Sequence, residues 1–160
     1  NTPAPGANRT GCHPGGFVGD GFRDRNMIHT LLVPRTAMTA MRRHVRRRAP
    51  LEACGLLAGR NGRVELVVGV RNIARSPVRY LMDPRQQWQA FEKFEQLGLE
   101  LLGIYHSHPN GPSRPSPTDI KQALYEAVQV IWSRQGDTWK VDGFWITAGK
   151  VSKVTLQPDR

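Results

Sequence analysis

The sequence predicts an α/β domain in which helices flank a mixed sheet. Apolar residues recur with strand-like and helix-like spacing in turn along the chain, which is typical of domains built from interleaved strands and helices. Asn61-Gly62 stands between two apolar runs and indicates a hairpin, because both residues tolerate positive φ. A doubly wound parallel sheet contains no such hairpin, so we expect parallel and antiparallel strands in one sheet.

Composition divides the chain into two parts. With 160 residues, of which 39% are hydrophobic and 22% charged, it is long enough for one domain with a buried core. Residues 1–26 are rich in Gly, Pro, Asn and Arg and show no periodicity, so we expect a disordered N-terminal tail. The patterned region begins at Met27, and residues 27–160 are expected to form the domain.

The first half of the domain is expected to hold a strand, a helix and a hairpin. Residues 28–33 are apolar enough for the strand, and Pro34 suits the first turn of a helix that runs to about residue 48. One face of this helix is apolar, and arginines crowd the remainder. Residues 54–70 are expected to form the hairpin, and residues 78–82 a short strand.

The second half begins with a helix that Asp83 is expected to cap, with Pro84 at its first position. Three of its aromatic residues are spaced for burial: Trp88, Phe91 and Phe94. Residues 99–105 are expected to form a buried strand that leads directly into His106. A third helix is predicted from four apolar residues at helical spacing: Ile120, Ala123, Leu124 and Ala127. Closing strands are expected at residues 128–132, 143–148 and 151–156.

The charge and the cysteine count restrict the partners and the compartment. The formal net charge is +10, which favours acidic partners such as nucleic acid, anionic lipid or an acidic protein. The two cysteines, Cys12 and Cys54, are too few for a disulfide framework and suit a reducing compartment. The sequence contains no apolar run as long as a membrane span and no secretory signal pattern. We therefore expect a soluble cytoplasmic protein without a membrane partner.

His106 and His108 are the strongest candidates for metal ligands. They stand two residues apart at the end of a predicted strand, so both imidazoles project from one face. Asp119 follows ten residues after His108, at the predicted start of a helix, where a short loop can bring it back. Two histidines and one carboxylate leave the fourth position of a tetrahedral zinc open for water, which distinguishes a catalytic site from a structural one.

Catalysis at such a site also needs a proton carrier and a donor for the oxyanion. Glu52, just before the first hairpin strand, is the best candidate for the base that takes a proton from the water and returns it to the leaving amine. Ser116 is positioned to donate a hydrogen bond to the oxyanion that develops on the attacked carbonyl.

Three segments together resemble the signature of the JAMM (MPN-plus) metalloprotease family. They are Glu52-Ala-Cys-Gly, His106-Ser-His-Pro and Ser116-Pro-Thr-Asp. The family pattern is a distant Glu, then His-Ser/Thr-His-Pro, then a Ser after seven intervening residues and an Asp three beyond it. Residues 109–115 supply those seven residues, so the match has no gaps. The resemblance covers roughly residues 27–160.

The resemblance implies a JAB domain, with a mixed sheet like that of cytidine deaminases, that cuts amide or isopeptide bonds at the C-terminus of ubiquitin or ubiquitin-like proteins. It implies that Zn²⁺ is held by His106, His108 and Asp119, that Glu52 is the acid/base and that Ser116 steadies the tetrahedral intermediate. Only 41 residues follow Asp119, too few for the ubiquitin-gripping insertion of eukaryotic members. The chain thus resembles the compact prokaryotic branch, whose substrates include β-grasp sulfur carriers ending in Gly-Gly. Some members of that branch release cysteine from a carrier's C-terminus.

Simpler structural explanations exist for several of these residues. Ser116 and Asp119 also form an acceptable helix cap, which is compatible with a catalytic Ser116. Glu52 taken alone resembles a solvated loop charge. Cys54 is expected to be a small buried residue rather than a nucleophile, because no base accompanies it. The arginines of the first helix form either a solvated surface or a docking site for an acidic carrier.

Two other functions remain open at this point. MPN-type domains that have lost their metal ligands act as scaffolds, but this chain keeps a complete ligand set. A basic nucleic-acid-associated protein would explain the net charge, but the sequence contains no helix-turn-helix, RNA-binding aromatic motif or zinc-finger spacing. We therefore expect nucleic acid not to be the partner. The sequence leaves the oligomeric state, the identity of the carrier and the leaving amine undetermined.

Overall fold

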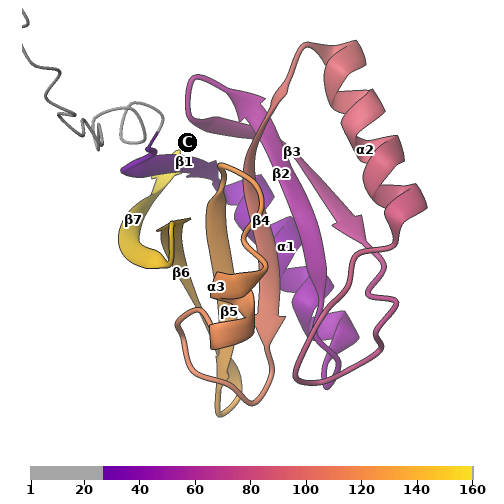
Figure 1. Cartoon of the computed structure of the whole chain (residues 1–160), viewed down its shortest axis with the longest axis vertical. Coiled ribbons are helices and arrows are strands. Elements are labelled where there is room, and N and C mark those ends of the chain that lie inside the picture. The colour runs from indigo at the N-terminus through magenta and orange to yellow at the C-terminus, as the bar shows by residue number, and fades with distance from the viewer. Residues whose placement is uncertain (1–26, 160) are drawn as a thin grey trace, which may run out of the picture.

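A computed structural model describes residues 27–159 (Figure 1). The predicted tail at residues 1–26 lies outside the described residues. None of the described helices is long and apolar enough to cross a membrane.

A single sheet of seven strands forms the centre of the domain. The strands are β1 (Thr30–Pro34), β2 (Cys54–Arg60), β3 (Arg63–Val70), β4 (Glu100–His108), β5 (Val128–Gln135), β6 (Thr138–Thr147) and β7 (Lys150–Asp159). They lie in the order β1-β3-β2-β4-β5-β6-β7, and β7 returns to pair with β1, so the sheet closes on itself. Three neighbouring pairs are parallel and the others antiparallel, which confirms the predicted mixed sheet. The closure was not predicted.

Helix α1 (Arg35–Arg48) covers one face of this sheet. Its apolar stripe consists of Ala37, Met41 and Val45, all buried in the larger of two hydrophobic clusters. Fully buried residues from the strands complete that cluster, including Leu57, Tyr105 and Trp132. The predicted helix boundaries are confirmed to within a residue, because Pro34 precedes the helix as its N-cap instead of lying inside its first turn.

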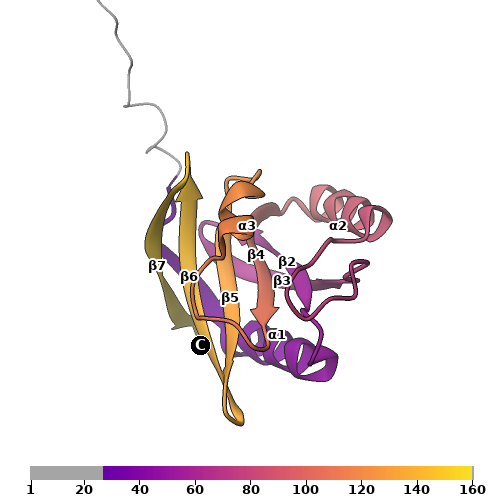
Figure 2. The ribbon, with the colours of Figure 1, turned by 60° about the horizontal axis from the view of Figure 1, so that its bottom comes forward.

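Helix α2 (Pro84–Leu97) packs on the opposite face, so that β2 and β3 lie between it and α1 (Figures 1 and 2). Asp83 accepts a hydrogen bond from the backbone N–H of Arg85, as the cap prediction required. Phe94 is buried and Phe91 partly buried against the second cluster. Trp88 is 62% exposed, so its predicted burial is wrong.

The predicted hairpin is present as β2 and β3. Asn61 and Gly62 form its turn with φ values of 52° and 71°, the left-handed conformation that the dipeptide favours. The three predicted closing strands are also present as β5, β6 and β7, each longer than expected.

Two predicted elements are wrong. The segment 78–82 is not a strand: its pairing is limited to one isolated bridge between Asn72 and Met82. The Asn72 side chain occupies the positions that a neighbouring strand would take, accepting from Leu81 N–H and donating to the Arg79 carbonyl. The third helix, α3 (Pro117–Lys121), is a single turn. The chain leaves it so that Ala127 joins the core and Val128 pairs with Gly103, which leaves Leu124 85% exposed.

Strand alternation decides which residues reach the face that carries α2 and α3. Ile104 belongs to the α2 cluster, and His106 and His108 follow it at spacings of two along β4. Cys54 and Leu56 of β2 lie on the same face, and Glu52 stands two residues before Cys54. Tyr105 points instead to the α1 side. Both histidines and Glu52 are therefore directed to one side of the sheet.

A substitution at Gly55 would test how tightly the α1 side of the sheet is packed. A Cβ atom at this position would lie within 2.5 Å of three atoms of the Tyr105 side chain. Tyr105 cannot easily move, because it is fully buried and its hydroxyl is hydrogen-bonded to His44 Nδ1 at 2.6 Å. We expect Gly55→Ala to lower the free energy of unfolding by about 2–3 kcal/mol, measured by urea denaturation. Gly69→Ala is the graded control: its Cβ meets His44 at 3.1 Å, so its effect should be smaller. Equal stabilities of the two variants would contradict this packing.

Candidate metal centre

Strand pairing brings Glu52 beside the two histidines. In the antiparallel ladder of β2 and β4, Cys54 lies opposite His106, and the same register continued by two residues places Glu52 opposite His108. The hydrogen bond from Ser107 N–H to the Ala53 carbonyl, at 3.0 Å, continues the ladder beyond β2. The structure thus brings together residues that are separated by more than fifty positions in the sequence.

A helix cap orients the third candidate ligand, Asp119. Ser116 is the N-cap of α3, and its hydroxyl oxygen accepts from the Asp119 backbone N–H at 3.1 Å. In return, Asp119 Oδ2 accepts from the Ser116 backbone N–H at 2.8 Å, which completes a capping box. Pro117 occupies the first helical position. The capping and metal-binding interpretations of this segment are therefore compatible, because one carboxylate oxygen is held by the cap and faces the histidines.

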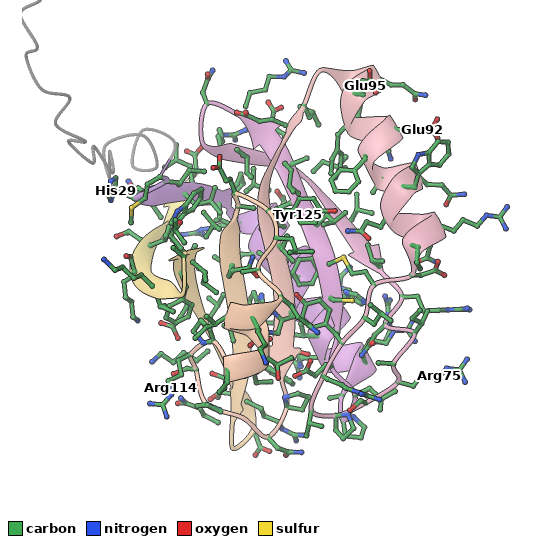
Figure 3. All side chains as sticks on the ribbon, in the orientation of Figure 1. His29, Arg75, Glu92, Glu95, Arg114 and Tyr125 are labelled. Carbon is green, nitrogen blue, oxygen red and sulfur yellow. The ribbon has the colours of Figure 1, made fainter. Side chains whose placement is uncertain are left out.

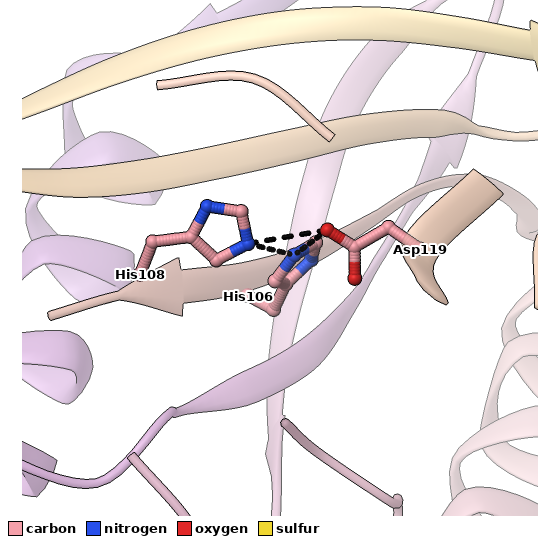
Figure 4. A group of neighbouring side chains, drawn as sticks. All are labelled: His106, His108 and Asp119. Atoms are coloured by element: carbon pink, nitrogen blue, oxygen red, sulfur yellow. Dashed lines mark hydrogen bonds and ion pairs between the residues drawn. The ribbon is translucent and has the colours of Figure 1, made fainter. Parts of the chain in front are cut away.

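Three ligand atoms converge on one point from β4 and α3 (Figure 4). His106 Nε2 lies 3.0 Å from His108 Nε2, and Asp119 Oδ2 lies 3.2 and 3.1 Å from these two nitrogens. Tetrahedral zinc with bonds of about 2.0–2.1 Å requires ligand atoms about 3.3–3.4 Å apart, so a modest expansion of this triangle accommodates the ion. In the described part of the chain, this is the group of His, Cys, Asp and Glu side chains arranged to hold a metal.

Hydrogen bonds and burial shift the pKa values of the two histidines in opposite directions. His108 Nδ1 lies 2.8 Å from the Pro112 carbonyl oxygen, so Nδ1–H donates to this oxygen and Nε2 is the ring atom that faces the other ligands. Burial lowers the pKa of His106, which keeps this fully buried ring neutral. Burial also opposes protonation of His108, but the hydrogen bonds with Asp119 and Pro112 outweigh it and raise the pKa.

Asp119 is held as a carboxylate. Burial alone would raise the pKa of its carboxyl group, but the hydrogen bonds with both histidines and with the Ser116 N–H bring the pKa well below its ordinary value. The centre therefore presents two imidazole nitrogens and one negative oxygen, a donor set that fits a borderline divalent cation.

Glu52 is a buried carboxyl group next to this centre, not a solvated loop charge. Its side chain is 4% exposed, and Oε1 lies 4.0 Å from His108 Nε2. Burial raises the pKa of Glu52 to about 7, although the charge of His108 opposes this shift. Among the described residues, no hydrogen-bond partner faces its Oε2. A desolvated carboxyl group with a pKa near neutrality can both accept and release a proton, as acid/base catalysis requires.

Ser116 and Glu52 face a common cavity beside His108. The cavity has a volume of about 160 Å³, and its other walls come from Pro77, Val78 and the segment 110–112. Because Ser116 Oγ accepts from Asp119 N–H, its own hydroxyl proton remains available to a molecule in the cavity. The structure thus places all five predicted site residues around one centre.

Three further residues position the site, and sequence reasoning assigned them no role. Ser107 Oγ accepts from the Ala53 N–H at 2.8 Å and so fixes the backbone beside Glu52. The Tyr80 ring lies against the His106 ring, with centroids 4.7 Å apart. Asn72 donates to the Glu52 carbonyl at 3.1 Å. For Ser107 a signal existed, its place between the two histidines, whereas Tyr80 and Asn72 lie in a segment without a readable pattern.

Two side chains given no catalytic role have structural ones. Cys54 is fully buried, its thiol contacts the Val70 carbonyl, and burial raises the thiol pKa to about 12, which fits the expected inert residue. His44 lies within hydrogen-bond distance of the Tyr105 hydroxyl, with 2.6 Å between Nδ1 and the hydroxyl oxygen.

Comparison with known proteins places this centre in a family context. The model of a family described as prokaryotic homologs of the JAB domain matches residues 34–147. A probable TtuB-protein conjugate cleaving protease of Thermus thermophilus is 43% identical over 80% of this chain and 80% of its own length. A desampylase of Pyrococcus furiosus is 39% identical over 79% of this chain and 89% of its own. A CysO-cysteine peptidase of Mycobacterium tuberculosis is 36% identical over 62% of this chain and 69% of its own length.

Solved structures show the same fold. A protein from Desulfitobacterium hafniense superposes with a TM-score of 0.75 at 32% identity, over 82% of this chain and 94% of its own. A JAB1/MPN domain protein from Archaeoglobus fulgidus, which is 15% identical, superposes with a TM-score of 0.51 over 79% of this chain and 97% of its own. The fold is thus shared across sequences that have diverged widely.

Removal of one imidazole tests the metal centre. We expect His108→Ala to lower affinity for the metal by at least ~100-fold, since changes even to residues that only support ligands cost about 10–100-fold. Metal content of the purified protein and titration calorimetry with Zn²⁺ would measure this loss. His29→Ala is the matched control, because His29 is exposed and lies away from the centre (Figure 3). Full metal occupancy in His108→Ala would contradict the assignment.

Proposed function

Because the chain belongs to the prokaryotic homologs of the JAB domain, we propose that its metal centre is a zinc site that hydrolyses the amide bond after the C-terminal Gly-Gly of a ubiquitin-like or sulfur-carrier protein. The three relatives are named as a protease, a desampylase and a peptidase, and the chain is a peptidase of this family. Two of these names also state the substrate. One is a conjugate of TtuB with a protein, and the other is CysO joined to cysteine.

One observation carries the proposal: a buried, unpaired carboxylate oxygen stands beside a convergent metal-ligand group. Glu52 Oε2 has no hydrogen-bond partner among the described residues, although it is shielded from solvent. Leaving such an oxygen without a partner costs free energy, so its retention indicates a functional partner that comes and goes. A water molecule between the metal and Glu52 fits this requirement.

The donor set supports zinc as the metal. Two histidine nitrogens and one carboxylate oxygen leave one tetrahedral position open, which is the arrangement of hydrolytic zinc sites. The same donor types also occur in non-haem iron oxygenases, but amide hydrolysis needs a Lewis acid and no redox change. When bound, zinc would make the water more acidic and polarise the carbonyl oxygen of the scissile bond.

Residues of the chain would carry the proton and stabilise the charge. Glu52 accepts a proton from the attacking water, and the water oxygen forms a bond to the carbonyl carbon of the terminal glycine. The Ser116 hydroxyl donates a hydrogen bond to the negative oxygen that results. The protonated Glu52 then donates its proton to the leaving nitrogen as the carbon–nitrogen bond breaks.

The surroundings of the centre suit a thin, extended substrate. The cavity at Glu52 and Ser116 has a volume of about 160 Å³, and a second cavity of about 420 Å³ is lined by Tyr80, whose ring packs on His106. Within the described residues, the chain passes from α3 to β5 at Val128 without an inserted subdomain between them. Glycine residues without side chains fit such narrow approaches. A Gly-Gly tail is therefore a better substrate than a broad folded epitope.

The proposal predicts that Glu52→Gln separates metal binding from turnover. The amide keeps the size of the carboxyl group but cannot accept a proton, so the rate of cleavage should fall at least ~10³-fold while zinc stays near one per chain. We would quantify zinc and the cleavage of a β-grasp carrier extended past its Gly-Gly terminus, with and without chelator. Glu92→Gln on α2, which is exposed, is the matched control and should retain full activity.

Each outcome of this experiment has a distinct meaning. Chelator-sensitive cleavage after Gly-Gly by the wild type but not by Glu52→Gln supports the metal, the base and the substrate class together. Zinc without any cleavage would refute the substrate class. Wild-type protein that binds no zinc would refute the proposal and favour a scaffold function.

A second prediction separates the two uses of Ser116. Ser116→Ala removes both the helix cap and the proposed oxyanion donor, so we expect kcat to fall by about 10²–10³-fold and stability to fall by about 1 kcal/mol. Ser116→Thr keeps a hydroxyl group and should recover most of both. Kinetics and urea denaturation of the two variants would show this. A loss of stability in Ser116→Ala with unchanged kcat would leave the residue with a capping role alone.

A further inference from the structure

Two adjoining cavities form a groove between the last turns of α1 and the end of β3, which we call the α1–β3 groove. The cavities have volumes of about 330 and 470 Å³ and share His44, Arg48, Val70 and Arg71 in their walls. The smaller cavity is also lined by Glu52. Glu52 also lines the separate cavity beside His108, so this one buried residue lies between the groove and the candidate metal centre.

The groove is strongly basic. Four exposed arginines line it: Arg47, Arg48, Arg71 and Arg75. Arg75 projects outward from the segment after β3 (Figure 3). No ion pair within residues 27–159 neutralises any of the four. Glu52 is the sole carboxylate among the lining residues, and its side chain is directed to His108.

His44 forms part of the wall without adding charge. Its Nδ1 lies 2.6 Å from the Tyr105 hydroxyl oxygen, and burial, together with the charges of Arg47 and Arg48, lowers its pKa to about 4. The ring is therefore neutral near pH 7. The positive potential of the groove comes from guanidinium groups, which remain charged across the physiological range.

Unpaired guanidinium groups crowded around a concave surface repel one another and favour an anionic partner. Arginine binds carboxylates through two parallel hydrogen bonds, so acidic side chains of a protein are suitable ligands. Nucleic acid is another polyanion with the same attraction. Because only Glu52 lies between the groove and the candidate metal centre, the groove favours a protein partner whose tail reaches that centre over nucleic acid.

We propose that the α1–β3 groove docks an acidic surface of the folded carrier while the carrier's Gly-Gly tail reaches the metal centre. This inference rests on the proposed function. The relatives named for a TtuB-protein conjugate and for CysO-cysteine differ in what is removed, whereas a carrier is present in both names. The carrier is thus the part that both substrates share. A binding surface away from the scissile bond is suited to recognising it. An extended tail advances about 3.4 Å per residue, so four or five residues place the carrier's folded body roughly 15 Å from the centre.

The test compares a folded substrate with its tail alone. The substrates are an acidic β-grasp carrier extended past Gly-Gly and a short peptide of the same C-terminal sequence. We expect Arg47→Gln/Arg71→Gln to raise KM for the folded carrier at least ten-fold, with kcat and peptide cleavage within two-fold of wild type. The matched control is Arg43→Gln/Arg46→Gln, which removes two exposed charges from α1 outside the groove. Its KM should change less than two-fold.

The dependence of KM on salt concentration is an independent test of the same contact. An increase from 50 to 500 mM NaCl should raise KM for the folded carrier in the wild type but have little effect in the groove variant. A groove variant with the wild-type KM at 50 mM NaCl, or with the same salt dependence of KM as the wild type, would overturn the proposal.

Binding measurements separate this proposal from the proposed function. If neither substrate is cleaved, the function fails, and fluorescence anisotropy of the labelled carrier still tests docking: weaker binding to the groove variant than to the control supports it. Equal binding to both variants overturns it. A labelled 30-base-pair DNA duplex that binds the wild type but not the groove variant, with carrier KM unaffected, would assign the groove to nucleic acid instead.

Discussion

The structure depends on the convergence of three electron-pair donors at a buried point. His106 Nε2, His108 Nε2 and Asp119 Oδ2 lie 3.0–3.2 Å from one another, and both histidines are almost completely buried. Neutral imidazole lone pairs and a carboxylate repel at this separation unless a proton or a cation lies between them. A proton satisfies two of the three atoms, whereas a divalent cation satisfies all three. The fold must therefore hold these groups against their repulsion, and much of the local structure does so.

Several hydrogen bonds outside the centre supply that restraint. Ser107 fixes the backbone of Ala53, and Glu52 donates its own N–H to the Ser76 carbonyl at 2.9 Å. Asn72 binds the Glu52 carbonyl and also ties down the backbone of the segment 74–81. That segment carries Tyr80, whose ring packs on His106. One irregular segment therefore braces both the proposed acid/base, Glu52, and a proposed metal ligand, His106.

The sequence identifies the chemistry of the site better than its geometry. The resemblance to the metalloprotease family depends on the types and order of five residues: Glu52, His106, His108, Ser116 and Asp119. Local periodicity is enough to predict α1, α2 and the hairpin. The register between β2 and β4 has no local signal, because it depends on pairing between residues that are far apart in the sequence, from Gly59 with Glu100 to Cys54 with His106. For the third helix, a local signal was present but predicted too long an element. Its apolar spacing favours a longer helix, but the pairing of Val128 with Gly103 requires the chain to leave α3 after one turn.

The shortness of α3 links helix formation to the metal. A single turn cannot persist on intrinsic helix propensity, because its few internal hydrogen bonds do not offset the entropy of ordering the chain. Its capping box uses the Asp119 oxygen that faces the histidines, so one atom closes the helix and completes the ligand triangle. A cation at the centre balances the negative charge of this carboxylate and draws it toward β4. Binding of a metal at this centre and the order of α3 would therefore stabilise each other, because the capping box holds both Asp119 and Ser116.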